Sequence, residues 1–343
     1  MKLLQNFTRY IQALALLTLQ LFFILSSCEA GEYHLASKSP IKAVWMYRFS
    51  ELDNKQTILE LQAMEINLVF LSTDSNKLLP NGENASLEYT QKVRDFIKRA
   101  HYEKISVHAM TLEDPLFTLP KYHSQGAQLV KWIIAFCSDP ETHTPFDGLH
   151  IDTESHSLPA WSDALKAEDW DTMEKIMQQY VQLLAAIHTT LQKSPASLPF
   201  SAATHWKNSE WAAEGKIPSA NPNNLGLYLD FLVPMVYEIT ESAKIHSRSL
   251  DETVAMPTLV GISAFDFSKY QQLDDTTLAL SENFKNSRNH LGVAIYKFSE
   301  LKALYNKTRL LRNEHKITST TNFFVGAQTA RLPFAGKLPA LLR

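Results

Sequence analysis

The chain contains little glycine and cysteine for its length, and these shortages exclude several kinds of protein. Only 10 Gly and 2 Cys occur among 343 residues, so neither a disulfide framework nor a thiolate zinc cluster can form. The sequence has no GxGxxG and no GxxxxGK(S/T) motif, although the loops that cradle phosphates depend on such glycines. We therefore expect no nucleotide ligand and no other cofactor.

An excess of charge of one sign is also missing. The chain carries 33 Lys and Arg against 36 Asp and Glu, and these residues make up only 20% of it. Without a basic surface nothing neutralises a phosphate backbone, so a nucleic-acid partner is not expected. The length and an apolar content of 45% are sufficient for a buried core, in one large α/β domain or in two small ones.

Residues 1–27 have the pattern of a targeting signal. Lys2 and Arg9 precede an almost wholly apolar run over residues 11–25, which is shorter than the roughly 20 residues that a membrane-spanning helix needs. The run leads into Leu-Ser-Ser-Cys at residues 25–28 and resembles the bacterial lipobox, in which the cysteine receives lipid. The resemblance implies a lipoprotein signal peptide over 1–27, lipid on Cys28 and a polar tether over 28–40.

Two alternatives stay open for this segment. A secretory signal cut after Ala30 also fits, because residues 28–30 offer small side chains at the right spacing, and an uncleaved anchor is the other alternative. In each case we expect the protein to work outside the cytoplasm, and the lipoprotein signal predicts a place in the cell envelope, on the extracytoplasmic side. Acyl chains on Cys28 would attach it to a membrane.

From residue 41 onward, short apolar or β-branched runs alternate with segments of helical periodicity, such as Ser86–Ala100, Gln125–Phe136, Thr172–Gln192 and Asp275–Ser287. Strands separated by helices indicate βαβ units and a parallel sheet. The expected strands are Ala43–Tyr47, Asn67–Ser72, Ile105–Met110, Gly148–Glu154, Phe200–Thr204, Phe231–Tyr237, Thr258–Ala264 and Gly292–Phe298.

Eight such units predict a (β/α)8 TIM barrel over residues 41–306, since barrels of this class have about 250 residues. A doubly wound open sheet is the alternative. The barrel is favoured because polar and aromatic residues gather where several strands end, and the active site of a barrel lies at that rim. A C-terminal helix and a basic extension are expected over 307–343.

The predicted fourth strand carries the ionisable groups. Within Phe146–Glu154, side chains alternate between two faces, so His150, Asp152 and Glu154 share one face, while the apolar residues between them suit contact with the helices. Buried carboxylates are costly unless they are paired or functional. A protonated Glu beside an ionised Asp is what cleavage of a glycosidic bond requires of its acid. A salt-bridged polar layer inside the barrel is the structural alternative.

This run resembles the fourth-strand signature DGxDxDxE of family-18 chitinase-type glycoside hydrolases. Asp147, Gly148, Asp152 and Glu154 match the signature, and His150 stands where the family has its first inner aspartate. The resemblance implies that Glu154 is the general acid and that Asp152 orients a substrate N-acetyl group, which itself attacks the anomeric carbon. A protonated His150 would stabilise Asp152 as the carboxylate.

Other strands resemble the family less closely. Met235–Glu238 is similar to its sixth-strand MxYD with Glu in place of Asp, and it implies that Tyr237 hydrogen-bonds the N-acetyl group. Gly292–Tyr296 is similar to the eighth-strand segment, with Tyr in place of the pocket-floor Trp, and Thr258–Phe265 is loosely similar to the seventh. The third-strand SxGG of the family is absent.

The same strand ends allow a second mechanism with two protein carboxylates. Glu238 ends the expected sixth strand and could face Glu154 across the mouth, and Asp266 follows the seventh strand. Carboxyl groups about 5 Å apart suit a protein nucleophile, whereas about 6.5–9.5 Å suits an inverting water.

Aromatic and histidine side chains at strand ends suit a sugar, whose apolar faces stack on rings. Besides His150, the candidate substrate contacts are Trp45, Tyr47, His108, Trp206, Asp266 and Tyr296. The histidines also suggest an alternative, because His108, His150, His156 and His205 near Asp152 and Glu154 could form a zinc or manganese site for a metal-dependent hydrolase. No HxH or HExxH spacing occurs, so no metal is assigned.

The sequence therefore predicts an extracytoplasmic lipoprotein that hydrolyses glycosidic bonds, and the family resemblance implies N-acetylated glycans as substrates. A carbohydrate-binding barrel that has lost catalysis is the main alternative, and the substitutions at 150, 238 and 296 motivate it.

Overall fold

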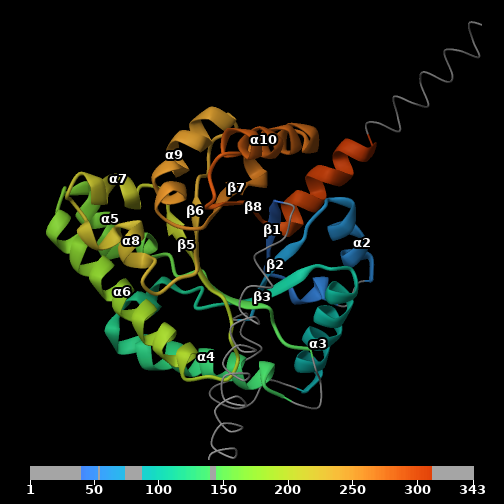
Figure 1. Ribbon diagram of the computed structural model, residues 1–343, viewed down its shortest axis with the longest axis horizontal. Coiled ribbons are helices and arrows are strands. Elements are labelled where there is room, and N and C mark those ends of the chain that lie inside the picture. Colours follow the sequence, from blue (N-terminus) through green and yellow to red (C-terminus); the bar gives the residue numbers. More distant parts are fainter. Residues whose placement is uncertain (1–39, 53–54, 74–86, 140–143, 311–343) are drawn as a thin grey trace, which may run out of the picture.

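In the computed structural model, eight parallel strands close into a barrel in the order of the chain, from β1 beside β2 to β8 beside β1 (Figure 1). The structure describes residues 40–52, 55–73, 87–139 and 144–310. The closed sheet confirms the predicted (β/α)8 TIM barrel and rules out the open doubly wound sheet. The signal peptide, Cys28 and nearly all of the expected tether and C-terminal extension lie outside the described residues.

Every predicted strand is present, and each begins within two residues of its predicted start. The strands are β1 (Ile41–Met46), β2 (Leu68–Ser72), β3 (Ser106–Thr111), β4 (Gly148–Ile151), β5 (Phe200–His205), β6 (Phe231–Met235), β7 (Thr258–Ser263) and β8 (His290–Tyr296).

Helices pack around the outside of the barrel (Figure 1). They are α2 (Lys55–Ala63), α3 (Leu87–Tyr102), α4 (His123–Cys137), α5 (Pro159–Lys166), α6 (Trp170–Gln192), α7 (Asn208–Ala213), α8 (Pro222–Leu225), α9 (Ser242–Ala255) and α10 (Tyr270–Asn283), and residues 298–310 are helical as well. Among the described residues, no helix has the length and apolar character needed to cross a membrane. After β4 and β5 the chain forms two helices each, α5–α6 and α7–α8.

Two layers of apolar side chains hold the barrel. The outer layer joins the strands to the helices and includes Leu149 and Ile151 of β4. The inner layer fills the barrel itself and consists of Ile41, Ala43, Trp45, Leu68, Phe70, Met110, Phe231, Val233, Leu259 and Ala294. His150 contacts this inner layer through Trp45 and Phe70. The predicted alternation is therefore confirmed for residues 149–151, whereas β4 ends at Ile151 and not at Glu154 as predicted.

The seam between the first and last strands depends on one glycine. Gly292 pairs with Ile41 and has a φ of 136°, in the region that favours glycine. A Cβ atom at this position would lie 2.0 Å from the carbonyl oxygen of Ile41. Nearby, the Lys42 ammonium group forms an ion pair of 2.7 Å with Asp274 of α10. The seam thus requires a residue without a Cβ atom at position 292.

Candidate active site

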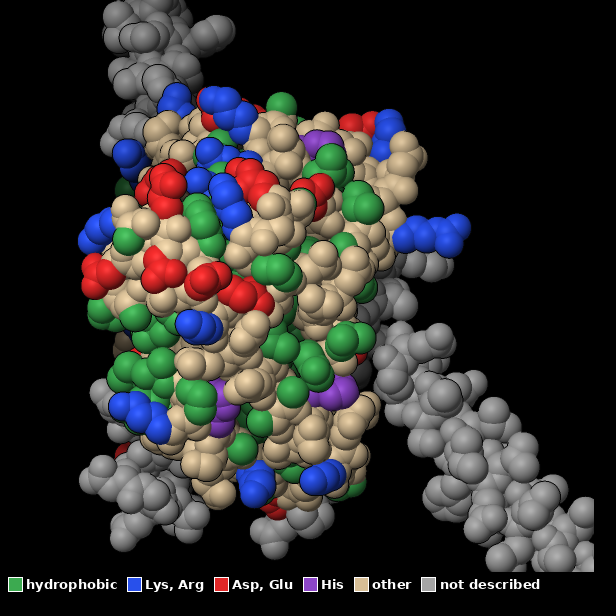
Figure 2. Space-filling model, turned by 90° about the vertical axis from the view of Figure 1, so that its left-hand side faces the viewer, with side chains coloured by type: hydrophobic (Ala, Val, Ile, Leu, Met, Phe, Trp, Pro, Cys, Tyr) green, Lys and Arg blue, Asp and Glu red, His purple; other side chains and the backbone are tan. Residues whose placement is uncertain are grey.

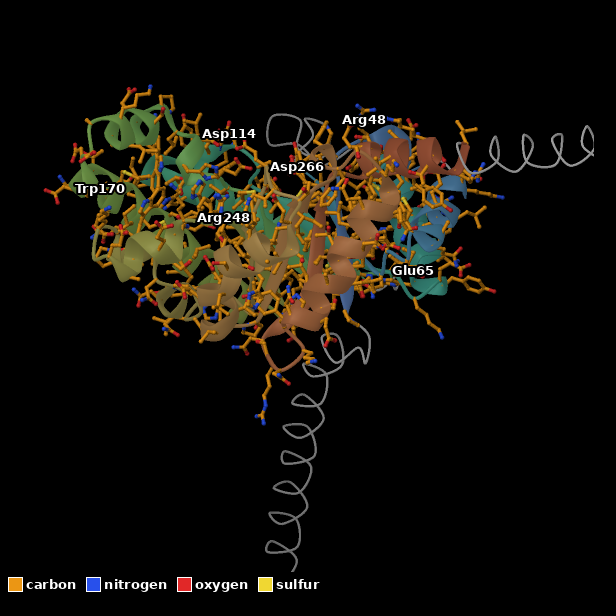
Figure 3. All side chains as sticks on the ribbon, turned by 90° about the horizontal axis from the view of Figure 1, so that it is seen from above. Arg48, Glu65, Asp114, Trp170, Arg248 and Asp266 are labelled. Carbon is orange, nitrogen blue, oxygen red and sulfur yellow. The ribbon has the colours of Figure 1, made fainter. Side chains whose placement is uncertain are left out.

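The residues that follow the strands meet at one edge of the barrel. Arg48 after β1, Asp114 after β3 and Asp266 after β7 lie along this edge, whereas Glu65, which precedes β2, lies toward the opposite end (Figure 3). Parallel strands carry their functional groups at their carboxyl ends. The edge that bears Asp266 is therefore the mouth in which the candidate site lies.

His150 forms the floor beneath this mouth and is fully buried. The indole N–H of Trp45 donates to its Nε2 at 3.2 Å, and its Nδ1 lies 2.9 Å from the hydroxyl of Ser201. Because an indole N–H can only donate, Nε2 is an acceptor and the proton resides on Nδ1. Burial holds the pKa of His150 well below its usual value, with a smaller contribution from His108. The ring is thus neutral and does not supply the positive charge that the sequence interpretation assigned to it.

His108 occupies space that Gly148 leaves open. A Cβ atom on Gly148 would lie 2.5 Å from Cε1 of His108, and the imidazole ring lies about 6 Å from the ring centroids of Phe70 and Phe231. The exposed fractions of Trp45, His108 and His150 are 1%, 4% and 0%. These three predicted substrate contacts form a layer below the mouth, and they are not part of its accessible surface.

Asp152 lies above that layer and is held by Tyr47. The Tyr47 hydroxyl donates to Oδ2 of Asp152 at 2.8 Å, and the exposed fraction of Asp152 is 7%. Burial raises the pKa of Tyr47, and the charge of Asp152 raises it further. The pKa values of Tyr237 and Tyr296 are also raised, first by burial and then by Asp152 and Glu154. All three hydroxyls therefore keep their protons and can donate hydrogen bonds.

The same tyrosines form an aromatic wall. The rings of Tyr237 and Tyr296 stack with centroids 5.5 Å apart, and Tyr47 meets Tyr296 edge-on at 5.9 Å. Phe265, which is 57% exposed, lies 6.2 Å from Tyr296. The structure thus brings three predicted site residues together around Asp152, beside an exposed ring that the sequence did not single out.

Glu154 is half-buried at the end of the extended segment that follows β4. Its Oε2 accepts a hydrogen bond of 2.9 Å from the Ser157 hydroxyl and lies 3.5 Å from Nε2 of His156. Burial lowers the pKa of His156, although the charge of Glu154 opposes this shift. The carboxyl group is therefore positioned by its own loop and remains accessible to a ligand.

Glu154 opens into a pocket of about 410 Å³, within the size range of small-molecule sites. Glu238 lines the same pocket, so the two carboxylates of the alternative mechanism share one cavity. The Glu238 backbone N–H donates to Oδ2 of Asp266 at 2.7 Å. Burial raises the pKa of Asp266, and the charge of Glu238 adds to this. The lining residues are Glu154, His156, His205, Trp206, Met235, Tyr237, Glu238 and Arg248.

Two charged residues near the mouth were missed by the sequence analysis. The Arg248 guanidinium lies 4.0 Å from the ring centroid of Trp206, but its position within an ordinary helical pattern contained no signal. Glu113 follows β3 closely and accepts a hydrogen bond from the Ser72 hydroxyl at the end of β2. Its place just after a predicted strand end was a signal that could have identified it.

The histidines do not assemble into a metal site. No group of three His, Cys, Asp or Glu side chains in the described part of the chain could hold a metal ion. His108 and His150 lie within the barrel, whereas His156 and His205 pair with each other at 4.8 Å in the pocket. The metal-dependent alternative therefore has no ligand set among these residues.

The sequence matches no protein-family model and no curated protein. Solved structures do resemble it. A GH18 chitinase from Pseudoalteromonas aurantia aligns with a TM-score of 0.54 and 14% identity, over 77% of this chain and 98% of its own. Exo-β-1,4-mannosidase Op5Man5 from Opitutaceae bacterium strain TAV5 aligns with a TM-score of 0.52 and 10% identity, over 76% of this chain and 52% of its own.

A GH5_18 protein from Streptomyces cattleya, solved in complex with GlcNAc, aligns with a TM-score of 0.52 and 12% identity, over 76% of this chain and 71% of its own. The present chain spans about half the length of the mannosidase. At these identities the likeness shows the fold, and the structural neighbours are glycoside hydrolases of several families.

Proposed function

We propose that the protein hydrolyses a glycosidic bond at the barrel mouth, with Glu154 as general acid and Asp152 as the supporting carboxylate. The observation that carries this proposal is the arrangement around Asp152. The nearly buried Asp152 carboxylate accepts a hydrogen bond of 2.8 Å from the Tyr47 hydroxyl, and Glu154, two residues further along the chain, lines an accessible pocket. Two carboxyl groups in different surroundings suit one acid and one anion. Structural neighbours with glycosidase activity add support for a carbohydrate substrate.

The proposed reaction uses the N-acetyl group of the substrate. Glu154 gives its proton to the glycosidic oxygen as the bond to the anomeric carbon breaks. The acetamido oxygen attacks that carbon, while Asp152 holds the acetamido N–H and Tyr237 donates to the acetamido oxygen. Water then adds to the anomeric carbon as the bond between that carbon and the acetamido oxygen breaks, and the Glu154 carboxylate takes up the proton of the water. This sequence of steps follows the resemblance to family-18 chitinases, in which the substrate assists.

The test is product release from N-acetylated and plain oligosaccharides by wild type and by Glu154→Gln. We expect cleavage of N-acetylated substrates and a loss of turnover in the variant with unchanged thermal unfolding. The control is Glu282→Gln on α10, where the glutamate is exposed. Full activity of Glu154→Gln would refute the assignment of the acid. Cleavage of plain glycans would instead transfer the second role from the acetamido group to Glu238.

A carbohydrate-binding barrel without catalysis is the second candidate, and His150 is the observation that favours it. The ring is neutral and fully buried, so it cannot share a proton or a charge with Asp152 in the way that an aspartate at this place would. Isothermal titration calorimetry separates the two functions, because a receptor shows affinity for oligosaccharides without any product release.

We also propose that lipid on Cys28 holds the barrel at a membrane on the extracytoplasmic side. The lipobox-like sequence at residues 25–28 supports this. Metabolic labelling with a palmitate analogue should label the wild type and should not label the Cys28→Ser variant. We also expect the variant, unlike the wild type, in the soluble fraction of the cells. Equal labelling of both proteins would refute the site of lipidation.

A further inference from the structure

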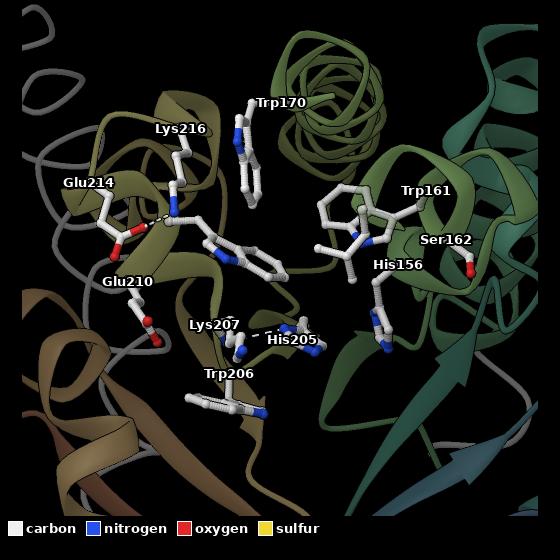
Figure 4. Close-up of a pocket in the computed structure, with 12 residues that line it drawn as sticks. His156, Trp161, Ser162, Trp170, His205, Trp206, Lys207, Glu210, Glu214 and Lys216 are labelled. Atoms are coloured by element: carbon white, nitrogen blue, oxygen red, sulfur yellow. Dashed lines mark hydrogen bonds and ion pairs between the residues drawn. The ribbon is translucent and has the colours of Figure 1, made fainter. Parts of the chain in front are cut away.

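A second pocket of about 460 Å³ lies beside the mouth, between the segments that follow β4 and β5. Figure 4 shows rings and charged groups arranged around this cavity. Its lining combines four tryptophans, one leucine and seven polar or charged side chains: His156, Trp161, Ser162, Leu165, Trp170, His205, Trp206, Lys207, Glu210, Trp211, Glu214 and Lys216. We call it the tryptophan pocket.

The tryptophans differ in what they offer to a ligand. Trp161 and Trp211 are 2% and 5% exposed and lie 5.9 Å apart, so they form the back wall. Trp170 and Trp206 are half-buried, and each presents part of its ring to the cavity. Trp170 lies 6.3 Å from Trp211, and the Lys216 ammonium lies 4.5 Å from its ring centroid. Aromatic ring faces with polar groups around them suit a pyranose ring, which has apolar faces and polar edges.

The tryptophan pocket adjoins the pocket of Glu154. His156, His205 and Trp206 line both cavities. His156 lies 3.5 Å from the Glu154 carboxylate, and the His205 ring is parallel to that of Trp211 at 5.2 Å. A ligand that extends past these two histidines therefore occupies both cavities.

The charges around the tryptophan pocket nearly cancel. Lys216 and Glu214 form an ion pair of 2.7 Å, and Lys207 and Glu210 add one charge of each sign. Side chains of both signs also lie over the face of the molecule that bears α5 to α8 (Figure 2). Burial lowers the pKa of His205 to about 3, so this ring is neutral in ordinary buffers. Balanced charge favours a neutral ligand over an anionic one.

We propose that the tryptophan pocket is a second carbohydrate subsite, which binds neutral pyranose units of the same chain whose glycosidic bond lies at Glu154. The position of that bond rests on the proposed function, whereas the subsite itself rests on the geometry of the second cavity. The protein would then prefer oligosaccharides long enough to fill both cavities, and Trp170 would contribute to affinity only for those longer chains.

The experiment measures binding to Glu154→Gln protein, so that no turnover interferes. The probes are β-1,4-linked oligosaccharides of N-acetylglucosamine and of mannose, each as disaccharide and hexasaccharide, titrated by calorimetry. We expect the hexasaccharide of at least one series to bind about tenfold more tightly than its disaccharide, which corresponds to about 1.4 kcal/mol and lies within the range of a ring-stacking contact. Adding Trp170→Ala should remove most of this difference. Adding Tyr102→Ala, which removes an aromatic ring that is 85% exposed on α3, should retain it.

Three results would overturn the subsite: no binding of any probe, equal affinity for short and long chains, or a length dependence that Trp170→Ala leaves intact. Should Trp170→Ala fail to fold, a second pair of variants at Trp206 replaces it. Trp206→Ala should abolish the length dependence, whereas Trp206→Phe, which keeps an aromatic ring, should preserve at least part of it. Tighter binding of a sulfated hexasaccharide than of the neutral one would contradict the neutral ligand. Failure of the proposed function is a separate result, because wild type would release no product while the length dependence persisted.

Discussion

Glu252 is expected to make the stability of the protein depend on pH. This residue lies in α9 with an exposed fraction of 2%, and one carboxyl oxygen accepts a hydrogen bond from the Ser209 hydroxyl of α7. The other oxygen has no hydrogen-bond partner among the residues that the structure describes. Burial raises the pKa of Glu252 from 4.5 to about 7, even though the Ser209 hydrogen bond opposes the shift. The folded protein therefore binds a proton here more tightly than the unfolded chain does.

The sign follows from the linkage between proton binding and folding. When the folded state raises the pKa of a carboxyl group, the group stabilises the folded state fully at pH values below its pKa in the unfolded chain. This stabilisation is lost as pH rises through the pKa in the folded state. Each pKa unit corresponds to about 1.4 kcal/mol, so a rise from 4.5 to about 7 amounts to about 3 kcal/mol. The loss takes place between about pH 4.5 and about pH 7.

The perturbation is Glu252→Gln, which keeps the shape of the side chain and removes its titration. Urea unfolding followed by circular dichroism, at several values between about pH 5 and about pH 8, gives the free energy of unfolding of each protein. The free energy of unfolding of the variant, relative to that of wild type, should rise by up to about 3 kcal/mol as pH rises across this range. Comparison with wild type cancels the titration of all other groups.

Glu282→Gln provides the matched control, because that glutamate is exposed on α10. The change with pH in the free energy of unfolding should be larger for Glu252→Gln than for this control. A difference between wild type and Glu252→Gln that stays constant from about pH 5 to about pH 8 would refute the reasoning, since it would mean that burial does not shift the pKa of Glu252.

Three further changes test the layers of the site. Tyr47→Phe removes the 2.8 Å hydrogen bond to Asp152, and we expect turnover of a cleavable oligosaccharide to fall about tenfold or more; unchanged turnover would contradict the role of this bond. Gly148→Ala places a methyl group 2.5 Å from the His108 ring and should destabilise the protein by about 1–3 kcal/mol, measured by urea unfolding. The pKa of Asp147 is lowered, because hydrogen bonds and charge from its neighbours outweigh burial, so its contribution is present at neutral pH and lost in acid. Asp147→Asn should therefore lower the free energy of unfolding by about 1.5–3 kcal/mol near pH 7 and by less near pH 3. An equal loss at both pH values would contradict the lowered pKa of Asp147.

The barrel could be predicted because each strand has a pattern that the sequence displays locally. Runs such as Phe231–Met235 are apolar on both faces, as expected of a parallel sheet covered by helices. The ladder of His150, Asp152 and Glu154 was predictable for the same reason, since alternation along a strand needs no knowledge of its neighbours. Only the end of the strand differed, because regular pairing stops at Ile151 and the two carboxylates lie just beyond it.

What could not be predicted depends on contacts between distant segments. The protonation state of His150 follows from Trp45 of β1 and Ser201 of β5, which are 105 and 51 residues away in sequence. Arg248 reaches Trp206 only because α9 packs beside the segment after β5. The tryptophan pocket requires the packing of α5, α6 and α7 against one another, and no local spacing encodes that. The tryptophans themselves were visible, but their common cavity was not.

The pairing of β1 with β8 has a consequence for how the chain folds. Ile41 finds its partner Gly292 only after some 250 intervening residues have been made, so the first strand has one unsatisfied edge throughout synthesis. Exposed strand edges promote association with other chains. A nascent or truncated chain that ends before β8 would therefore display two open edges, and it would depend on chaperones or rapid degradation to stay monomeric. The last strand of this barrel is thus what converts an aggregation-prone open sheet into a molecule that no longer presents an edge.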